Sequence, residues 1–268
     1  MSATLLRLRT EPDQRLDLSS VTPDRLRDLS AGEIARLPVA TTRTECLLGD
    51  VFDISLGDPH RIHIAGGSRR LDGIGSAMSV GEIRVEGDVG QRAGLGMRGG
   101  SLAIDGDAGP LAGARMAGGT LRIGKDAGAF AGGTIPGDMA GMRGGLLVIG
   151  GCAGERLGDR MRRGVIVVFG ESGPHSGSRM IGGTIVAASL GDLPGTLMRR
   201  GSIVAARHGE IAPTFVSAGF LELQFLDVLR AWLGQRDPAA AALVPGTVEY
   251  LHGDAATLGR GEILLGAV

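Results

Sequence analysis

The sequence predicts an all-β-dominated fold: a right-handed, single-stranded parallel β-helix of about seven coils, each about 19 residues long. A small N-terminal α/β cap and a C-terminal segment of one helix and strands are expected to flank it. Three observations predict this fold: where the glycines lie, a repeated spacing of methionines, and an apolar pair at a fixed distance after each repeated methionine.

The glycines are concentrated in one part of the chain. Of 48 glycines, 38 lie between residues 64 and 209, which points to a repeat in that segment. Collagen is excluded because no strict three-residue period accompanies the glycine. Disorder is excluded because 43% of the residues are hydrophobic and the net charge is only −1. Glycine supplies the positive-φ corners that a tightly wound coil needs.

Seven of the nine methionines define the repeat. They are separated by 19, 19, 26, 19, 19 and 18 residues, so one coil carries seven extra residues. A glycine follows each of them after three residues, and apolar residues follow after five and seven, which indicates a strand with one face inward. The methionines are Met78, Met97, Met116, Met142, Met161, Met180 and Met198. The structural glycines are Gly81, Gly100, Gly119, Gly145, Gly164, Gly183 and Gly201.

The outward residue between each inward pair changes along the repeat. It is Arg84, Ala103 and Arg122 in the first three coils. In the last four coils it is Val148, Val167, Val186 and Val204. An apolar outer face of this size must be covered, by a helix expected within 215–235, by another subunit, or by both.

The flanks divide the chain into an N-terminal cap region (1–58), the glycine-rich repeats (59–209) and a C-terminal helix with a pair of strands packing on the repeats (210–268). Thr22-Pro23 and Ser30-x-x-Glu33 are helix-start signatures. The apolar spacing of 215–235 is close to helical. The segments 247–251 and 262–265 are expected to be strands.

Basic residues gather one or two positions after the repeated methionines. We interpret this row as a strip for an acidic partner surface or an anionic ligand tail. The alternative is a solvated face whose charges are offset by nearby acids. The strip consists of Arg98, Arg143, Arg162, Arg163, Arg199 and Arg200.

No catalytic or metal-binding constellation stands out. Asp88, Asp107 and Asp126 share one offset and should stack at one corner, where local turn hydrogen bonds or a bound cation would account for them. Cys152 follows in that row and is expected to be a small buried residue. The pair His60-x-x-His63 offers only two ligands, too few for a metal site.

The chain is expected to be cytoplasmic. Its N-terminus lacks the apolar run of a signal peptide, and no apolar stretch approaches the roughly 18–20 residues that cross a bilayer. Two cysteines fit a reducing compartment. The net charge of −1 gives no electrostatic case for binding nucleic acid or a membrane.

The repeat resembles the glycine-rich β-helix family that includes the C-terminal domain of the large subunit of glutamate synthase and the C subunit of formylmethanofuran dehydrogenase. The motif that carries the resemblance is Met97–Gly109, with copies from Met78 to Gly209. The tail from Gly253 to Leu264 is similar to the ending of the formylmethanofuran dehydrogenase subunit.

This resemblance implies a non-catalytic scaffold subunit of a formyltransferase/hydrolase complex. Such a complex moves a formyl group from formyl-tetrahydromethanopterin to a methanofuran-type carrier and releases formate in the one-carbon metabolism of methylotrophic bacteria. The implied partners are amidohydrolase-like, dehydrogenase B-like and formyltransferase subunits, and no cofactor is implied for this chain alone. The alternatives are the C subunit of a tungsten or molybdenum formylmethanofuran dehydrogenase, a glutamate synthase-type β-helix domain, and an independent β-helix binding module or carbohydrate-active enzyme.

One departure from the repeat is an insertion of seven residues between Ala129 and Met142, which we place within 130–138. Our hypothesis is that this loop, with Arg143, touches a partner or the anionic tail of the carrier.

Overall fold

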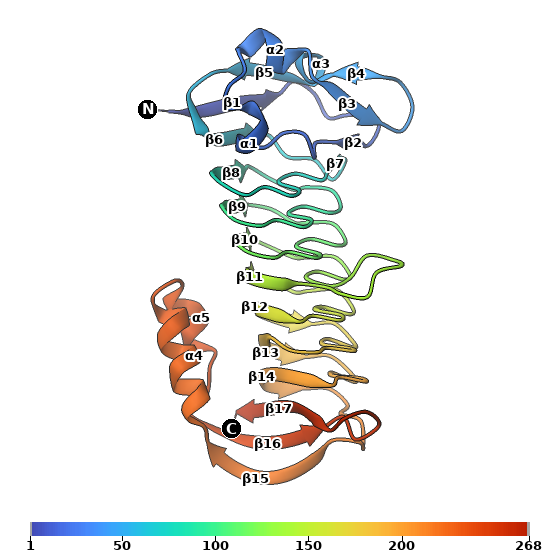
Figure 1. Ribbon diagram of the computed structural model, residues 1–268, viewed down its shortest axis with the longest axis vertical. Coiled ribbons are helices and arrows are strands. Elements are labelled where there is room, and N and C mark those ends of the chain that lie inside the picture. Colours follow the sequence, from blue (N-terminus) through green and yellow to red (C-terminus); the bar gives the residue numbers. More distant parts are fainter. Residues whose placement is uncertain (1, 267–268) are drawn as a thin grey trace.

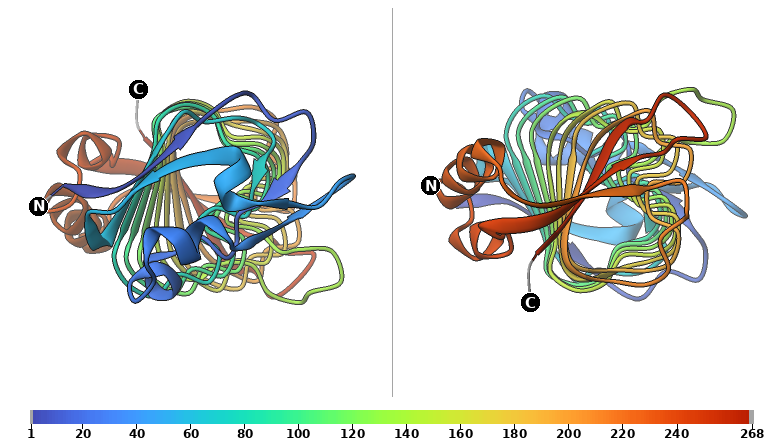
Figure 2. Two further views of the ribbon diagram at one scale, coloured as in Figure 1. Left: turned by 90° about the horizontal axis from the view of Figure 1, so that it is seen from above. Right: turned by 90° about the horizontal axis from the view of Figure 1, so that it is seen from below.

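The computed structural model describes residues 2–266 and shows a mostly β protein, drawn out into a rod (Figure 1). A long, mixed and largely parallel sheet runs along it. Among the described residues this sheet has 13 strands, in the order β15-β16-β17-β14-β13-β12-β11-β10-β9-β8-β6-β1-β5. Viewed from either end, the turns of the chain lie one above another (Figure 2).

The repeated segment supplies the parallel core of this sheet. Its strands are β6 (Asp58–Ala65), β8 (Glu82–Val85), β9 (Ser101–Ile104), β10 (Thr120–Ile123), β11 (Arg143–Ile149), β12 (Arg163–Ser172), β13 (Thr184–Leu190) and β14 (Arg200–His208). Strands β8, β9 and β10 have four residues each, whereas β11 to β14 have seven to ten.

The strand register matches the sequence repeat. Ile83 lies beside Leu102, and Leu102 beside Leu121, each 19 residues further along the chain. Leu121 then pairs with Leu147 across the longer coil. The stack also extends beyond the seven repeated methionines, because Ile62 of β6 pairs with Ile83. The first inward position of each strand therefore forms one continuous apolar ladder, and its members are buried.

A second ladder consists of the seven repeated methionines, all of them 0% exposed. Each methionine reaches toward the glycine of the next coil. At Gly119 (φ +78°), for example, an added Cβ would lie 2.7 Å from Met97 Cε and 2.7 Å from the carbonyl oxygen of Gly100. The space that a side chain would need is thus filled by the methionine and backbone of the preceding coil. This explains why methionine and glycine recur together at a spacing of three.

The N-terminal region closes one end of the rod. β1 (Ala3–Leu8) continues the long sheet in parallel with β6, and β5 (Phe52–Ser55) pairs antiparallel with β1. A smaller sheet of four strands lies beside them, in the order β4-β3-β2-β7. Its strands are β2 (Leu16–Asp17), β3 (Pro38–Thr41), β4 (Cys46–Leu47) and β7 (Leu71–Asp72).

Three short helices cover this end of the core: α1 (Pro23–Leu26), α2 (Ala31–Ala35) and α3 (Leu48–Val51). The two predicted helix starts are confirmed. Pro23 occupies the first turn of α1, and Ser30 forms a capping box with Glu33 at α2. Phe52 is 1% exposed and belongs to the main core at this end.

The C-terminal region closes the other end. β17 (Arg260–Gly266) pairs in parallel with β14, and β16 (Thr247–Gly253) pairs antiparallel with β17, which confirms the predicted pair of strands. The helical interpretation of 215–235 is wrong for its first half. Residues Val216–Glu222 form strand β15 at the edge of the sheet, and the helix α4 covers Gln224–Gly234. A short helix, α5 (Pro238–Ala242), follows.

The division of 215–235 has a physical reason. The backbone of β15 pairs with β16 at the edge of the sheet, and all of its residues, apolar ones included, are exposed. Only from Gln224 onward does a helical stripe of Leu226, Leu229 and Leu233 become buried. Helical spacing of apolar residues alone does not distinguish these two segments.

We expect Gly119→Ala to destabilise the chain more than Gly96→Ala. Both glycines have positive φ, but nothing lies within 4 Å of a Cβ on Gly96. Gly96→Ala should therefore cost only left-handed strain, about 1–2 kcal/mol. Gly119→Ala should add overpacking of about 1–3 kcal/mol. Urea unfolding midpoints measure the difference, and equal midpoints would show that close contact between coils is not the constraint.

Candidate functional site

The predicted row of aspartates lies at one corner of the rod, and its hydrogen bonds run between coils. The carboxylate Oδ1 of Asp88 accepts from the backbone N–H of Asp107 at 2.9 Å, and Asp107 accepts from Asp126 at 3.2 Å. Asp126 accepts from the N–H of Cys152 at 2.7 Å. The expectation of turn bonds local to each coil is therefore wrong: each side chain links its own coil to the next.

Cys152 continues this row, but it is exposed rather than buried. Its Sγ lies 3.4 Å from the backbone nitrogen of Glu171, in the place where the preceding coils have a carboxylate oxygen. The corner leaves this side chain on the surface because it points along the stack and away from the core. Burial of cysteine is a tendency of the residue type, and the position in the coil overrides it.

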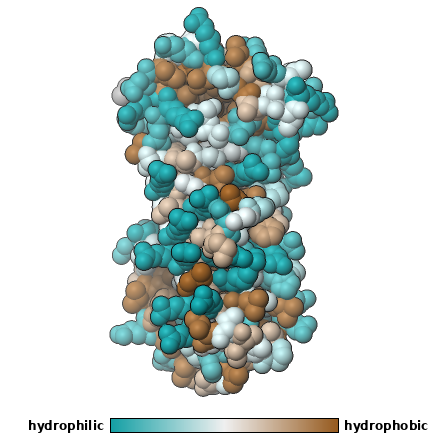
Figure 3. Space-filling view, turned by 45° about the vertical axis from the view of Figure 1, so that its right-hand side comes forward, coloured by the Kyte–Doolittle hydropathy of each residue, from teal (hydrophilic) through white to brown (hydrophobic). Residues whose placement is uncertain are grey.

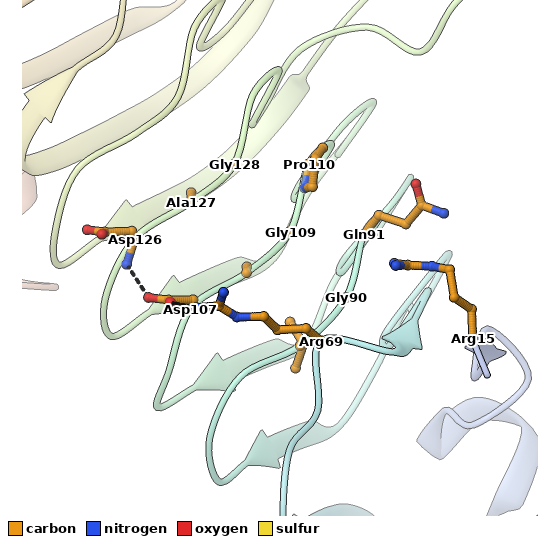
Figure 4. Close-up of a pocket in the computed structure, with 12 residues that line it drawn as sticks. Arg15, Arg69, Gly90, Gln91, Asp107, Gly109, Pro110, Asp126, Ala127 and Gly128 are labelled. Atoms are coloured by element: carbon orange, nitrogen blue, oxygen red, sulfur yellow. Dashed lines mark hydrogen bonds and ion pairs between the residues drawn. The ribbon is translucent and has the colours of Figure 1, made fainter. Parts of the chain in front are cut away.

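A hollow of about 390 Å³ adjoins this corner (Figure 4). Its floor includes the bare backbone of Gly90, Gly109 and Gly128. The arginines at its rim are paired: Arg69 lies 3.1 Å from Asp88 and 2.6 Å from Asp107, and Arg15 binds Asp72. Both arginines of the hollow are thus already paired with carboxylates of this chain.

The hydrogen bonding in the aspartate row lowers the pKa of Asp88. The hydrogen bond from Asp107 N–H, opposed by burial and reinforced by Arg69, holds the pKa of the Asp88 carboxyl below its usual value. The carboxylate is therefore ionised at neutral pH and serves as a permanent acceptor for the next coil.

The six arginines of the predicted strip are all exposed. Within residues 2–266, no carboxylate lies within ion-pair distance of them. Strand register brings Arg143 beside Arg163, and Arg200 beside Arg260. Arg260 was not predicted from the sequence as part of the strip, although Arg260–Ile263 repeats the Arg-Gly-x-Ile pattern of Arg200–Ile203.

The strip is interrupted in two places. The backbone N–H of Arg98 bonds to Met78 O in the preceding coil. One coil later the N–H of Ala117 makes the same bond to Met97 O, so alanine takes the arginine position there. Isoleucine takes this position three coils later, where the N–H of Ile181 bonds to Met161 O. Arg98 is therefore set apart from Arg143. On the face shown in Figure 3, hydrophilic residues are spread along the rod, and larger apolar groups lie near its two ends.

The four valines of the outer face lie beneath α4 and α5. Val148 is 4% exposed and the other three are fully buried. They form a second core with the leucine stripe of α4, separate from the core inside the coils. Figure 1 shows the two helices along this side of the later coils, while β8 and β9 are left without a helix.

An ion pair marks where this helical cover ends. Arg122, the last charged residue of the outer row, lies 2.7 Å from Asp237 at the start of α5. Asp237 also accepts from the N–H of Ala240 at 3.1 Å and so caps the helix. Burial alone would raise the pKa of Asp237, but the hydrogen bonds from Arg122 and from the α5 backbone outweigh burial and lower it.

The insertion projects from the side of the rod opposite α4 and α5 (Figures 1 and 2). Its ion pair is with Arg115 of the preceding coil, through Asp138 at 3.0 Å. Arg143 lies instead at the exposed start of β11. The loop is thus tied to Arg115. That Arg143 acts with the loop in touching a partner or the anionic tail of the carrier stays a prediction.

The described residues contain no group of three or more His, Cys, Asp or Glu side chains that could hold a metal ion. His63 pairs with Glu86 at 2.8 Å rather than with His60. Cys46 and Cys152 are both free thiols. In the part of the chain that the structure describes, no helix is both long and apolar enough to cross a membrane.

These features define a class: a glycine-rich protein whose stacked coils form a long, largely parallel sheet, with charged and apolar surfaces set along it. Comparison with known proteins gives the family. The chain superposes with a TM-score of 0.95 on a chain from the crystal structure of the formyltransferase/hydrolase complex (FhcABCD) of Methylorubrum extorquens in complex with methylofuran. The two sequences are 48% identical, over 98% of this chain and 100% of that one.

A curated sequence, the C subunit of the formyltransferase/hydrolase complex Fhc of Methylorubrum extorquens, is 52% identical over 87 residues. That match spans 32% of this chain and 33% of the relative. No family model matches the chain. The chain belongs to the family of the C subunit of the formyltransferase/hydrolase complex Fhc.

We expect Asp237→Ala to loosen α4 and α5 from the valine face, because it removes both a helix cap and the partner of Arg122. The loss should be about 1–2 kcal/mol at pH 7, measured from urea unfolding midpoints. Asp227→Ala is the control, since that carboxylate is 71% exposed in its pair with Arg230 and should contribute little.

The same effect should depend on pH. The pKa of Asp237 is lowered in the folded chain. Its contribution to the free energy of unfolding is therefore fully present above the pKa of an unfolded aspartate, about 3.9, and is lost as the pH falls below that value. The difference between wild type and Asp237→Ala should therefore shrink below about pH 4. A difference that stays constant to pH 2 would contradict this assignment.

Proposed function

We propose that this chain is the non-catalytic scaffold subunit of a formyltransferase/hydrolase complex. In this complex, a formyl group passes from formyl-tetrahydromethanopterin to a methanofuran-type carrier, and formate is released. Amidohydrolase-like, dehydrogenase B-like and formyltransferase subunits would carry out these steps. The observation that carries the proposal is the full-length match, at 48% identity, to a chain of such a complex.

A scaffold role is supported by how the chain uses its polar residues. The aspartates of the corner row accept backbone hydrogen bonds from the next coil, and Arg69 pairs with two of them. These groups hold coils together. We take the coils to form a right-handed parallel β-helix, with 1–58 as its cap, 59–209 as its body and 210–268 as its closing segment.

We further propose that the arginine strip faces an acidic surface of a partner subunit or an anionic ligand tail. Exposed guanidinium groups in adjacent coils, such as those of Arg143 and Arg163, repel one another. Among the described residues, no carboxylate lies within ion-pair distance of the six arginines. An acidic partner would relieve this repulsion and set the orientation of docking. The planar guanidinium group of arginine can form two parallel hydrogen bonds with one carboxylate. Arginine is therefore suited to buried charge pairs at such an interface.

Native mass spectrometry of the complex from its source cells tests the assembly. The expected result is a hetero-oligomer of this chain with three other subunits, without tungsten or molybdenum. Iron–sulfur subunits with either metal would assign the chain to a formylmethanofuran dehydrogenase instead. A stable monomer that performs formyl transfer by itself would contradict the scaffold role.

The arginine strip is tested by reversing two of its charges. Arg143→Glu with Arg162→Glu should weaken association with the partner subunits by at least about tenfold, and should reduce the salt dependence of binding. Arg25→Glu with Arg43→Glu is the control, because it changes the net charge equally at exposed positions of the N-terminal region. Equal losses in the two variants would show that total charge, rather than the strip, governs assembly.

A further inference from the structure

The insertion encloses a cavity that the scaffold role does not use. Ordinary coils close with a hydrogen bond over three residues, as between Met116 N–H and Gly113 O. In the longer coil, the same bond joins Met142 N–H to Gly132 O, across ten residues. Arg115 N–H bonds to Gly133 O as Gly96 N–H bonds to Ala114 O, so Gly133 still occupies an ordinary coil position. The seven extra residues are therefore 134–140, shifted from the predicted 130–138, and they rise from the rod without changing the stack on either side.

The loop is fastened at several points, so the cavity is already formed. Thr134 Oγ1 donates toward the carbonyl oxygens of Ile135 and Asp138, both at 3.1 Å. Asp138 pairs with Arg115 of the coil before at 3.0 Å. The N–H of Gly141 bonds to Arg160 O of the coil after at 3.0 Å. A loop tied to both neighbours loses little further freedom when a ligand enters.

The cavity has a volume of about 340 Å³, within the range of small-molecule sites. Its lining comes from four successive coils, the last of which supplies Arg179, and is largely apolar. The apolar part consists of Pro110, Leu111, Phe130, Ile135 and Pro136. Such a lining favours a ring-sized apolar body.

The charges around this cavity do not balance. Asp159 is fully buried and is saturated by Arg179, at 2.9 and 2.8 Å, and by Ser178 Oγ at 2.7 Å. Asp138 is matched by Arg115. Arg160 also lines the cavity, and its only side-chain contact recorded in residues 2–266 is with the uncharged sulfur of Met139, at 3.0 Å. One guanidinium group is thus left for an anion.

We propose that this cavity binds a small organic carboxylate with a ring-sized apolar body, its carboxylate held by Arg160 and its body packed against Phe130. The proposal does not depend on the scaffold role, since it concerns only a cavity within this chain. No covalent step is involved, because the site offers binding groups alone.

The test uses phenylacetate as the probe, with its neutral isostere phenylacetamide, titrated into the full chain and followed by two-dimensional NMR of the backbone amides. Phenylacetate should bind with a Kd in the millimolar range or tighter, as expected for about ten heavy atoms. The shifted resonances should come from 110–111, 130–138 and 159–160. Phenylacetamide should bind about tenfold more weakly.

Two variants separate the pocket from general basicity. Arg160→Met should weaken phenylacetate binding about tenfold and remove the preference over phenylacetamide. Arg162→Met removes an equal charge from the strip and should change neither. Deletion of 134–140 restores a 19-residue coil and should abolish binding, while the resonances of β8 and β9 stay in place to show that the rod still folds.

Equal affinity for phenylacetate and phenylacetamide in the wild-type chain would overturn the proposal. So would shifts that map to the arginine strip, equal effects of Arg160→Met and Arg162→Met, or the absence of any binding to the folded chain.

Discussion

The interaction on which the rest of the structure depends is the contact between the methionine of one coil and the glycine of the next. A Cβ on Gly119 would come within 2.8 Å of both side-chain and backbone atoms of the preceding coil. Real Cβ atoms do not approach so closely, so glycine is required for the coils to lie at hydrogen-bonding distance. That distance in turn lets strands pair in register and lets each aspartate of the corner row reach the backbone of the following coil.

Because this stacking fixes every coil in the same orientation, residues at one repeat position become a row on the surface. The outward valines form one such row and bury themselves under α4 and α5. The arginines form another row, interrupted at Ala117 and Ile181, and stay exposed. The insertion is accommodated because the coil that carries it returns to the common register at Met142. Rows at fixed positions along the rod are what the proposed scaffold role requires.

Much of this arrangement could be predicted from the sequence because it repeats. The inward pair after each methionine and the outward valines follow from period alone, and they pair as the repeat requires. The features that depend on a single contact could not be predicted. Examples are the extended strand Val216–Glu222, the ion pair of Arg122 with Asp237, and the exposed Cys152. The unmatched charge of Arg160 required the three-dimensional structure, because it emerges only when the partners of the neighbouring arginines are known.

The central claim, that this chain positions other subunits and leaves the chemistry to them, is tested most directly by cryo-electron microscopy of the purified complex with its carrier bound. We expect the reacting end of the carrier and any catalytic metal to lie in other subunits, while the arginine strip contacts an acidic neighbouring surface or the carrier's anionic tail. A reacting group seated against residues of this chain would contradict the claim.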